Sequence, residues 1–139
     1  MVSALLEEPG ATTPAVLGDD QPERRSMKLV ACIIRPESLE AVKEALNVLQ
    51  FVGGMTITEV RGFGRQKGQV EHYRGGAYTV RFLPKVKVEV AVREEHVEPV
   101  LATIARAART GHVGDGKVFV MDMRHAVRIR TGETGASVL

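Results

Sequence analysis

The sequence predicts an α+β fold in which helices and strands alternate along a single domain. Two observations support this prediction. Four segments have apolar patterns typical of strands, and apolar residues recur at helical spacing in two others. The chain has 139 residues, which is room for one domain and a tail. Because 44% of the residues are hydrophobic but only 4% are aromatic, we expect an aliphatic core.

The first half of the domain is predicted as strand, helix and strand. Residues 29–34 form a continuous apolar run typical of a buried strand, and Arg35-Pro36 ends it. Apolar residues recur at helical spacing over residues 39–49, and Gly53-Gly54 is expected to end that helix. Residues 55–61 are predicted as the second strand.

The second half repeats the pattern. Residues 85–92 alternate, with valine at every second position, and predict a third strand. Residues 97–108 predict an amphipathic helix, with Gly111 as its stop. Residues 117–123 predict a fourth strand, and residues 127–129 a short fifth. The order is typical of a ferredoxin-like βαββαβ sandwich, whose helices cover one face of the sheet. The other face, expected to be rich in Val and Met, predicts self-association.

Two segments lie outside this pattern. Residues 1–26 carry Gly, Pro, Thr and Asp with little periodicity, so we expect a disordered leader before a domain at residues 27–139. Two alternatives stay open for Met27: it is the residue encoded by the start codon, or it is an internal residue that follows a genuine N-terminal extension. Residues 62–81 are polar and rich in glycine, and a loop of this length between strands is usually functional or disordered.

Composition narrows the class of protein. The chain has 19 basic and 17 acidic residues, a net charge of +2, so direct nucleic-acid binding is not expected. Cys32 is the one cysteine and lies in an apolar run, which favours a buried, inert thiol. The sequence shows neither an apolar run long enough to span a membrane nor a signal peptide, so we expect a cytoplasmic protein.

A glycine-rich segment at residues 110–117 is the first candidate binding site. Its three glycines let backbone N–H groups approach an anion closely, and Lys117 adds a positive charge. Gly111, Gly116 and Lys117 match the G-x-x-x-x-G-K spacing of a phosphate-binding loop. However, Val118 replaces the expected Ser or Thr, and the segment runs from helix to strand. A glycine-rich turn that ends the helix explains these residues equally well.

Two further segments are candidates. Arg128 and Arg130 are two residues apart, so on a strand both would project to one side, which suits phosphate recognition. Taken alone, the pair is better explained as two solvated surface arginines. Tyr73 and Tyr78 lie in the long polar segment and fit docking or modification points, or residues that cap the sheet edge.

These segments resemble the PII family of nitrogen-regulatory signal proteins. The resemblance covers Met27 to the end and rests on residues 58–68, 73–75, 82–87, 110–120 and 128–132, in that order. It implies a compact homotrimer that binds ATP or ADP between subunits and, with Mg²⁺ and ATP, 2-oxoglutarate. It also implies a long T-loop, about residues 64–81, that docks onto nitrogen-metabolism enzymes or ammonium and other transporters. Membrane contact would then come only through a transporter partner, and ATP hydrolysis would be slow at most.

The resemblance also implies roles for individual residues. The two arginines are expected to come from the neighbouring subunit, Gln66 to ligate Mg²⁺, and Tyr78 to match a tyrosine that some relatives uridylylate or adenylylate. The implied 2-oxoglutarate positions are Gln66, Lys67, Gly68 and Lys85. The implied nucleotide positions are Thr56, Gly62, Arg65, Glu89, Gly114, Asp115, Gly116, Lys117, Arg128 and Arg130.

Departures from the family pattern keep other functions open. Gly76, Ala77 and Arg81 replace residues usual in the T-loop, and one extra residue lies near residues 51–54. A specialised relative that regulates carbon or other transport through a different effector is one alternative. A ferredoxin-like enzyme that hydrolyses nucleotides is another, with only Asp115 and His112 placed as candidates for catalysis. RNA binding predicts aromatic residues on the central strands, and residues 85–92 have none.

Overall fold

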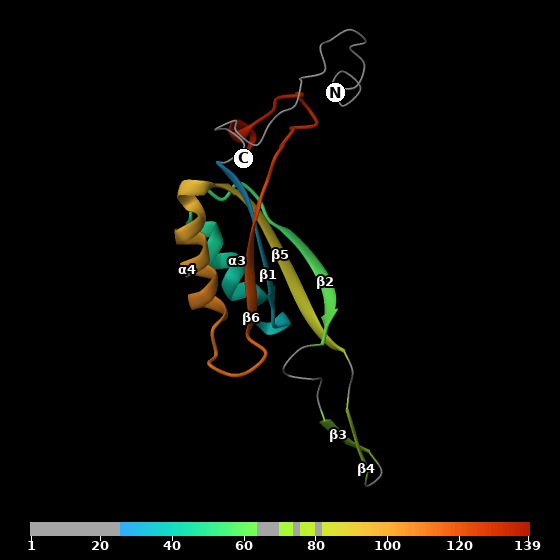
Figure 1. Ribbon diagram of the computed structural model, residues 1–139. Coiled ribbons are helices and arrows are strands. Elements are labelled where there is room, and N and C mark those ends of the chain that lie inside the picture. The colour runs from blue at the N-terminus through green and yellow to red at the C-terminus, as the bar shows by residue number, and fades with distance from the viewer. Residues whose placement is uncertain (1–25, 64–69, 74–75, 80–81) are drawn as a thin grey trace, which may run out of the picture.

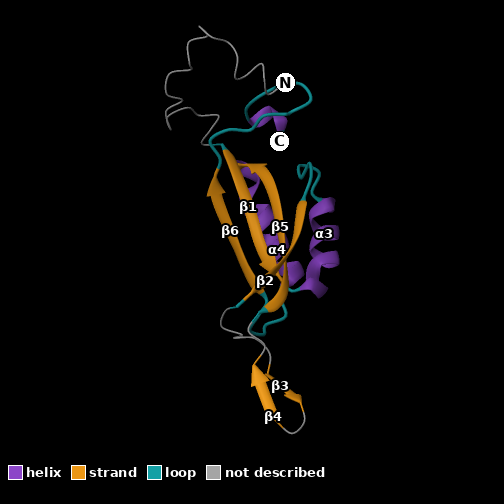
Figure 2. Ribbon diagram, turned by 90° about the vertical axis from the view of Figure 1, so that its right-hand side faces the viewer, coloured by secondary structure: helices purple, strands orange, loops and turns teal. Residues whose placement is uncertain are grey.

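The computed structural model describes residues 26–63, 70–73, 76–79 and 82–139. A four-stranded antiparallel sheet forms its centre, in the order β2-β5-β1-β6. Two helices pack on one face of this sheet (Figures 1 and 2). This arrangement confirms the predicted ferredoxin-like βαββαβ fold. The predicted leader, apart from Ser26, lies outside the described residues.

The elements are β1 (Met27–Ile34), α3 (Leu39–Val48), β2 (Thr56–Gly62), β3 (Val70–Tyr73), β4 (Gly76–Thr79), β5 (Leu83–Arg93), α4 (Val97–Ala108) and β6 (Gly116–Asp122). Short 3₁₀ turns precede both helices, at Pro36–Ser38 and Glu94–His96, and a third ends the chain at Ala136–Val138. Both helices end before the glycines that were expected to stop them, because Leu49 and Arg109 already adopt extended backbone.

The core lies between the sheet and the two helices. Val30, Cys32 and Ile34 point from β1 toward α3 and α4, as do the valines at positions 86, 88, 90 and 92 of β5. Their period of two is what a strand with one covered face requires. Cys32 is completely buried, and this burial raises the pKa of its thiol, as expected for an inert cysteine.

The uncovered face of the sheet differs from the predicted one. The β5 valines all face the helices, so on this face β5 presents Lys85, Lys87 and Glu89 instead. The strand register places Leu29 and Ile33 of β1 on the uncovered face, with Phe119 and Met121 of β6 beside them. Phe119 is 49% exposed and Met121 is 45% exposed. The face is therefore apolar along β1 and β6 but poor in valine.

Two other elements differ from the sequence prediction. The segment between β2 and β5 contains the antiparallel pair β3–β4, which lies beyond the end of the main sheet (Figure 1). The sequence did not predict this hairpin because Arg74-Gly75, between its strands, is not a strong hairpin signal. The predicted fifth strand at residues 127–129 is wrong: Val127 makes only an isolated bridge to Thr134, and a turn follows it.

Candidate functional site

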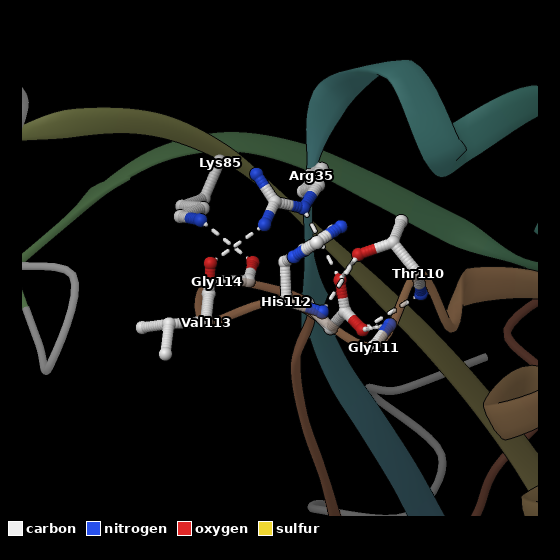
Figure 3. A network of polar contacts seen from close by, with 8 residues as sticks. Arg35, Lys85, Thr110, Gly111, His112, Val113 and Gly114 are labelled. Carbon is white, nitrogen blue, oxygen red and sulfur yellow. Dashed lines mark hydrogen bonds and ion pairs between the residues drawn. The ribbon is translucent and has the colours of Figure 1, made fainter.

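The glycine-rich loop, residues 110–117, joins α4 to β6. Figure 3 shows Thr110 to Gly114 of this loop, with Arg35 and Lys85 beside it. The Asp115 carboxylate accepts hydrogen bonds from the backbone N–H groups of Thr110, at 2.7 Å, and Gly111, at 2.9 Å. It also accepts one from the Thr110 hydroxyl. These contacts, with the Thr110 hydroxyl first among them, hold the pKa of Asp115 well below its usual range. The carboxylate therefore stays ionised and directed into its own loop.

Arg35 holds the same loop from the end of β1. Its Nε donates to Asp115 Oδ1 at 3.3 Å, and its Nη2 donates to the Val113 carbonyl at 2.6 Å. Sequence reasoning gave Arg35 no role beyond ending the first strand. The missing information was the strand register, which pairs Ile34 with Gly116 and so brings the residue after β1 next to the loop.

Gly116 shows why the loop needs glycine where it meets the sheet. Its φ is 108°, and a Cβ built there would lie 1.7 Å from the Ile33 carbonyl oxygen. Gly114 has a φ of 106°, a conformation that other residues rarely adopt. The backbone geometry of the loop therefore requires these glycines. The lack of a Cβ at the same positions also allows an anion to approach the backbone closely.

A pocket of about 690 Å³ opens beside this loop, and we call it the lysine pocket. Lys85 Nζ donates to the Gly114 carbonyl at 2.9 Å. Burial first, and then the charge of Arg35, lower the pKa of Lys85, so an anion in the pocket would stabilise its charged form. His112 lines the pocket, as do six residues predicted to bind nucleotide or 2-oxoglutarate: Gly62, Lys85, Gly114, Asp115, Gly116 and Lys117.

A second pocket, of about 510 Å³, contains other predicted residues, and we call it the arginine pocket. Thr56 and Glu89 line it as register partners on β2 and β5, together with Arg128. Arg128 Nη1 lies 2.9 Å from Glu133 Oε1. Arg130 lines neither pocket. It lies in the turn after Arg128, so the predicted strand that would align the two arginines is wrong.

The remaining predicted residues are less informative. Arg65, Gln66, Lys67 and Gly68 lie outside the described residues. Tyr78 lies on β4, with its backbone opposite Glu71. Within the described ranges, no group of three or more His, Cys, Asp or Glu side chains is placed to hold a metal ion. In the same part of the chain, no helix is long and apolar enough to cross a membrane.

The donor set of the lysine pocket fits an anion better than a cation. Two ammonium groups line the pocket, and the loop's own carboxylate is already occupied by Thr110, Gly111 and Arg35. A phosphate or carboxylate would therefore meet N–H groups and positive charge without meeting an unpaired negative charge. Fold and site together define a small α+β protein with a basic, glycine-lined pocket at one end of its sheet.

Comparison with known proteins identifies the family. Residues 27–133 match the family model of the nitrogen regulatory protein P-II. The P-II protein of Rhizobium etli is 53% identical over 113 residues, which cover 81% of this chain and all of that protein. The nitrogen regulatory protein GlnK of Escherichia coli K12 is 50% identical over the same shares of the two chains. The P-II protein of Rhizobium meliloti is 54% identical over 115 residues.

The chain therefore belongs to the nitrogen regulatory protein P-II family, a family of signalling regulators. This confirms the resemblance that its sequence motifs indicated.

Proposed function

We propose that this protein is a cytoplasmic, homotrimeric regulator of nitrogen assimilation that binds ATP or ADP and, with Mg-ATP, 2-oxoglutarate. The observation that carries the proposal is the lysine pocket, where a glycine-rich loop and two lysines converge. Its domain is residues 27–139, and residues 1–26 form a leader. Membership of the P-II family supports the signalling role.

The nucleotide phosphates would bind at the glycine-rich loop. Gly114 and Gly116 would offer backbone N–H groups and Lys117 a charge, while Gly62 leaves room beside the Lys85 side chain. Asp115 would act through the loop instead of touching the ligand, because its oxygens already accept hydrogen bonds from Thr110, Gly111 and Arg35. Arg65 completes the set of residues proposed from the family pattern.

The division of the predicted residues between two pockets supports a trimer. Thr56, Glu89 and Arg128 line a pocket separate from the lysine pocket of the same chain. A neighbouring subunit would bring its Arg128 and Arg130 to the lysine pocket, which makes each nucleotide site shared. The apolar strip of Leu29, Ile33, Phe119 and Met121 on the uncovered face of the sheet supports association between copies.

The effector 2-oxoglutarate would bind beside the phosphates, with one carboxylate on Lys85. Gln66 would ligate Mg²⁺, and backbone groups of Lys67 and Gly68 would contribute to the site. Mg²⁺ prefers octahedral oxygen ligands, so one ion can be shared between phosphate and dicarboxylate oxygens. Binding of the effector would then require Mg-ATP, and the coupling would act equally in both directions.

The segment of residues 64–81 would act as the T-loop that reads out the ligand state. It would dock onto nitrogen-metabolism enzymes or onto ammonium and other transporters, with Tyr78 as a possible modification site. We do not propose an enzyme, because the Asp115 carboxylate beside the pocket is held ionised by four hydrogen bonds and is poorly available as a base.

Isothermal titration of 2-oxoglutarate, with and without Mg-ATP, tests the proposal. We expect binding only with Mg-ATP, and at least a roughly tenfold loss in K85Q, because one charge-assisted contact is removed. ATP affinity should change far less in K85Q. K43Q is the matched control, because Lys43 pairs with Glu40 on the exposed side of α3.

The other outcomes separate the alternatives. ATP binding without 2-oxoglutarate binding would favour a specialised relative with a different effector, consistent with the changed residues Gly76, Ala77 and Arg81. ATP turnover at roughly 1–1000 per second would favour an enzyme. A protein that binds neither ATP nor ADP would refute the proposal.

A further inference from the structure

The loop between α3 and β2, residues 49–55, carries one wall of the arginine pocket. Gly53 and Gly54 line that pocket, next to Thr56 at the start of β2. Both glycines are exposed, and a Cβ built at Gly54 would meet no atom within 4 Å. Because two consecutive glycines have great backbone freedom and no side chain to pack, the position of this wall depends on the residues beside them.

Phe51 anchors the loop to the start of the second helix. Its ring stacks on the ring of His96, with the centroids 4.0 Å apart and the ring planes 18° apart. Phe51 also packs against the hydrophobic core, whereas His96 ends the 3₁₀ turn that precedes α4. The turn between helix and glycines is closed by a hydrogen bond from the Val52 N–H to the Leu49 carbonyl, at 3.1 Å. The ring stack therefore lies immediately before the pocket wall.

This loop is also where the chain carries one residue more than the family pattern. An extra residue adds backbone conformations that a bound ligand must restrict, which lowers affinity unless another contact restricts them first. A stacked pair of rings can supply that contact, because an aromatic side chain has only two rotatable bonds and a large contact area. The stack thus compensates for the length and the glycine content of the loop.

We propose that Phe51 and His96 are positioning residues that hold the Gly53-Gly54 wall of the arginine pocket in the shape that receives the nucleotide. The inference rests on the proposed function, whose site it deepens. Neither ring lines the pocket, so both act through the backbone of the loop. The two residues lie outside the set that the sequence motifs predicted, because their contact joins two separate segments of the chain.

Variants that remove one ring test the stack. F51L and H96L should each weaken ATP binding about fivefold, because the loop would then adopt its binding conformation only about a fifth of the time. H96F keeps two stacked rings and should bind ATP within about twofold of the parent. The double variant F51L/H96L should lose no more affinity than either single variant, since both substitutions remove the same contact.

The matched control is V100A, which destabilises the core without touching the loop. Val100 is completely buried on α4 and lines neither pocket. V100A should lower the melting temperature at least as much as F51L and keep ATP affinity within about twofold of the parent. Calorimetry and thermal unfolding measure the two effects. Parental ATP affinity in F51L and H96L, an equal loss in V100A, or no recovery in H96F would overturn the inference.

Nuclear magnetic resonance of the nucleotide-free protein separates this inference from the proposed function. The Phe51 ring should shield the ring protons of His96, so F51L should move their signals downfield. The Val52 amide should exchange several-fold faster in F51L and H96L than in the parent. If the parent binds no ATP, the proposed function fails, and these spectra still decide whether the stack holds the loop. Unchanged His96 signals and Val52 exchange would overturn the inference on that evidence alone.

Discussion

The glycine-rich loop and the arginine turn, residues 127–134, give similar basic signals in the sequence but hold their charges differently. In the loop, the acidic group Asp115 is engaged by Arg35 and by backbone donors, while Lys85 and Lys117 line the pocket. In the turn, Arg128 is paired with Glu133 of its own turn. A basic residue in a motif is therefore informative only when the position of its neutralising partner is known.

The two regions also lie at different places along the same sheet. Lys85 and Glu89, which line the lysine and arginine pockets, are four residues apart on β5, about 13 Å along an extended strand. Under the proposed function each pocket is a partial site, and a neighbouring copy would join the two.

The first prediction is complementation between two inactive variants. K117M should damage the lysine pocket and R128M the arginine pocket, each lowering ATP affinity on the order of 100-fold through loss of a charge-assisted phosphate contact in a shared site. Randomly mixed trimers of the two variants should recover about a quarter of the parental sites, since each site needs an intact pocket from both neighbours.

Calorimetric stoichiometry after unfolding and refolding the two variants together measures this recovery. The separately refolded variants, mixed afterwards, are the control. No recovery in the co-refolded sample would mean that one chain supplies both halves of the site, and the division into two partial sites would then have no functional meaning.

The second prediction separates the two roles of glycine in the loop. G116A should cost about 3 kcal/mol or more in unfolding free energy, because the new Cβ would clash with the Ile33 carbonyl at an unfavourable φ. G111A has an unfavourable φ of 89° but meets no atom within 4 Å, so it should cost only about 1 kcal/mol. Urea unfolding of both variants measures the difference, and equal costs would refute the steric explanation.

Much of the fold followed from the sequence, and the reasons are local. The alternation of Val86, Val88, Val90 and Val92 reports a strand with one covered face, and the helical spacing after Leu39 reports α3. The site was predictable only in part. Lys117 and the glycines form a local motif, whereas Arg35 joins the loop through a contact between positions 35 and 115 that depends on strand register. The predicted strand at residues 127–129 was wrong because the two-residue spacing of Arg128 and Arg130 does not distinguish a strand from a turn.

The third prediction concerns the pH dependence of the loop. The pKa of Asp115 is lowered in the folded protein from its usual 3.8, so its stabilising contribution is complete above that value and is lost as pH falls through the folded pKa. D115N should therefore be less stable than the parent at pH 6, and the gap should narrow only below about pH 3.8. T110V should show a smaller effect, since it removes the Thr110 hydroxyl and keeps the backbone donors.

Urea unfolding of the parent, D115N and T110V between pH 3 and pH 7 measures these gaps. A parent–D115N difference that narrows already between pH 6 and pH 5 would contradict the lowered pKa of Asp115. It would also weaken the view that the loop's carboxylate is neutralised internally.

The smallest expected effect comes from breaking the ion pair of the arginine turn. Glu133 is half exposed, its side chain 52% accessible, so E133Q should change the melting temperature by less than about 2 °C. Its effect on ATP affinity is the more informative measurement. If Glu133 merely neutralises Arg128, its removal should raise the affinity about twofold, because more of Arg128's charge becomes available to phosphate. A loss of affinity would instead mean that Glu133 positions Arg128, as Asp115 and Arg35 position the glycine-rich loop, and the two regions would then share one design.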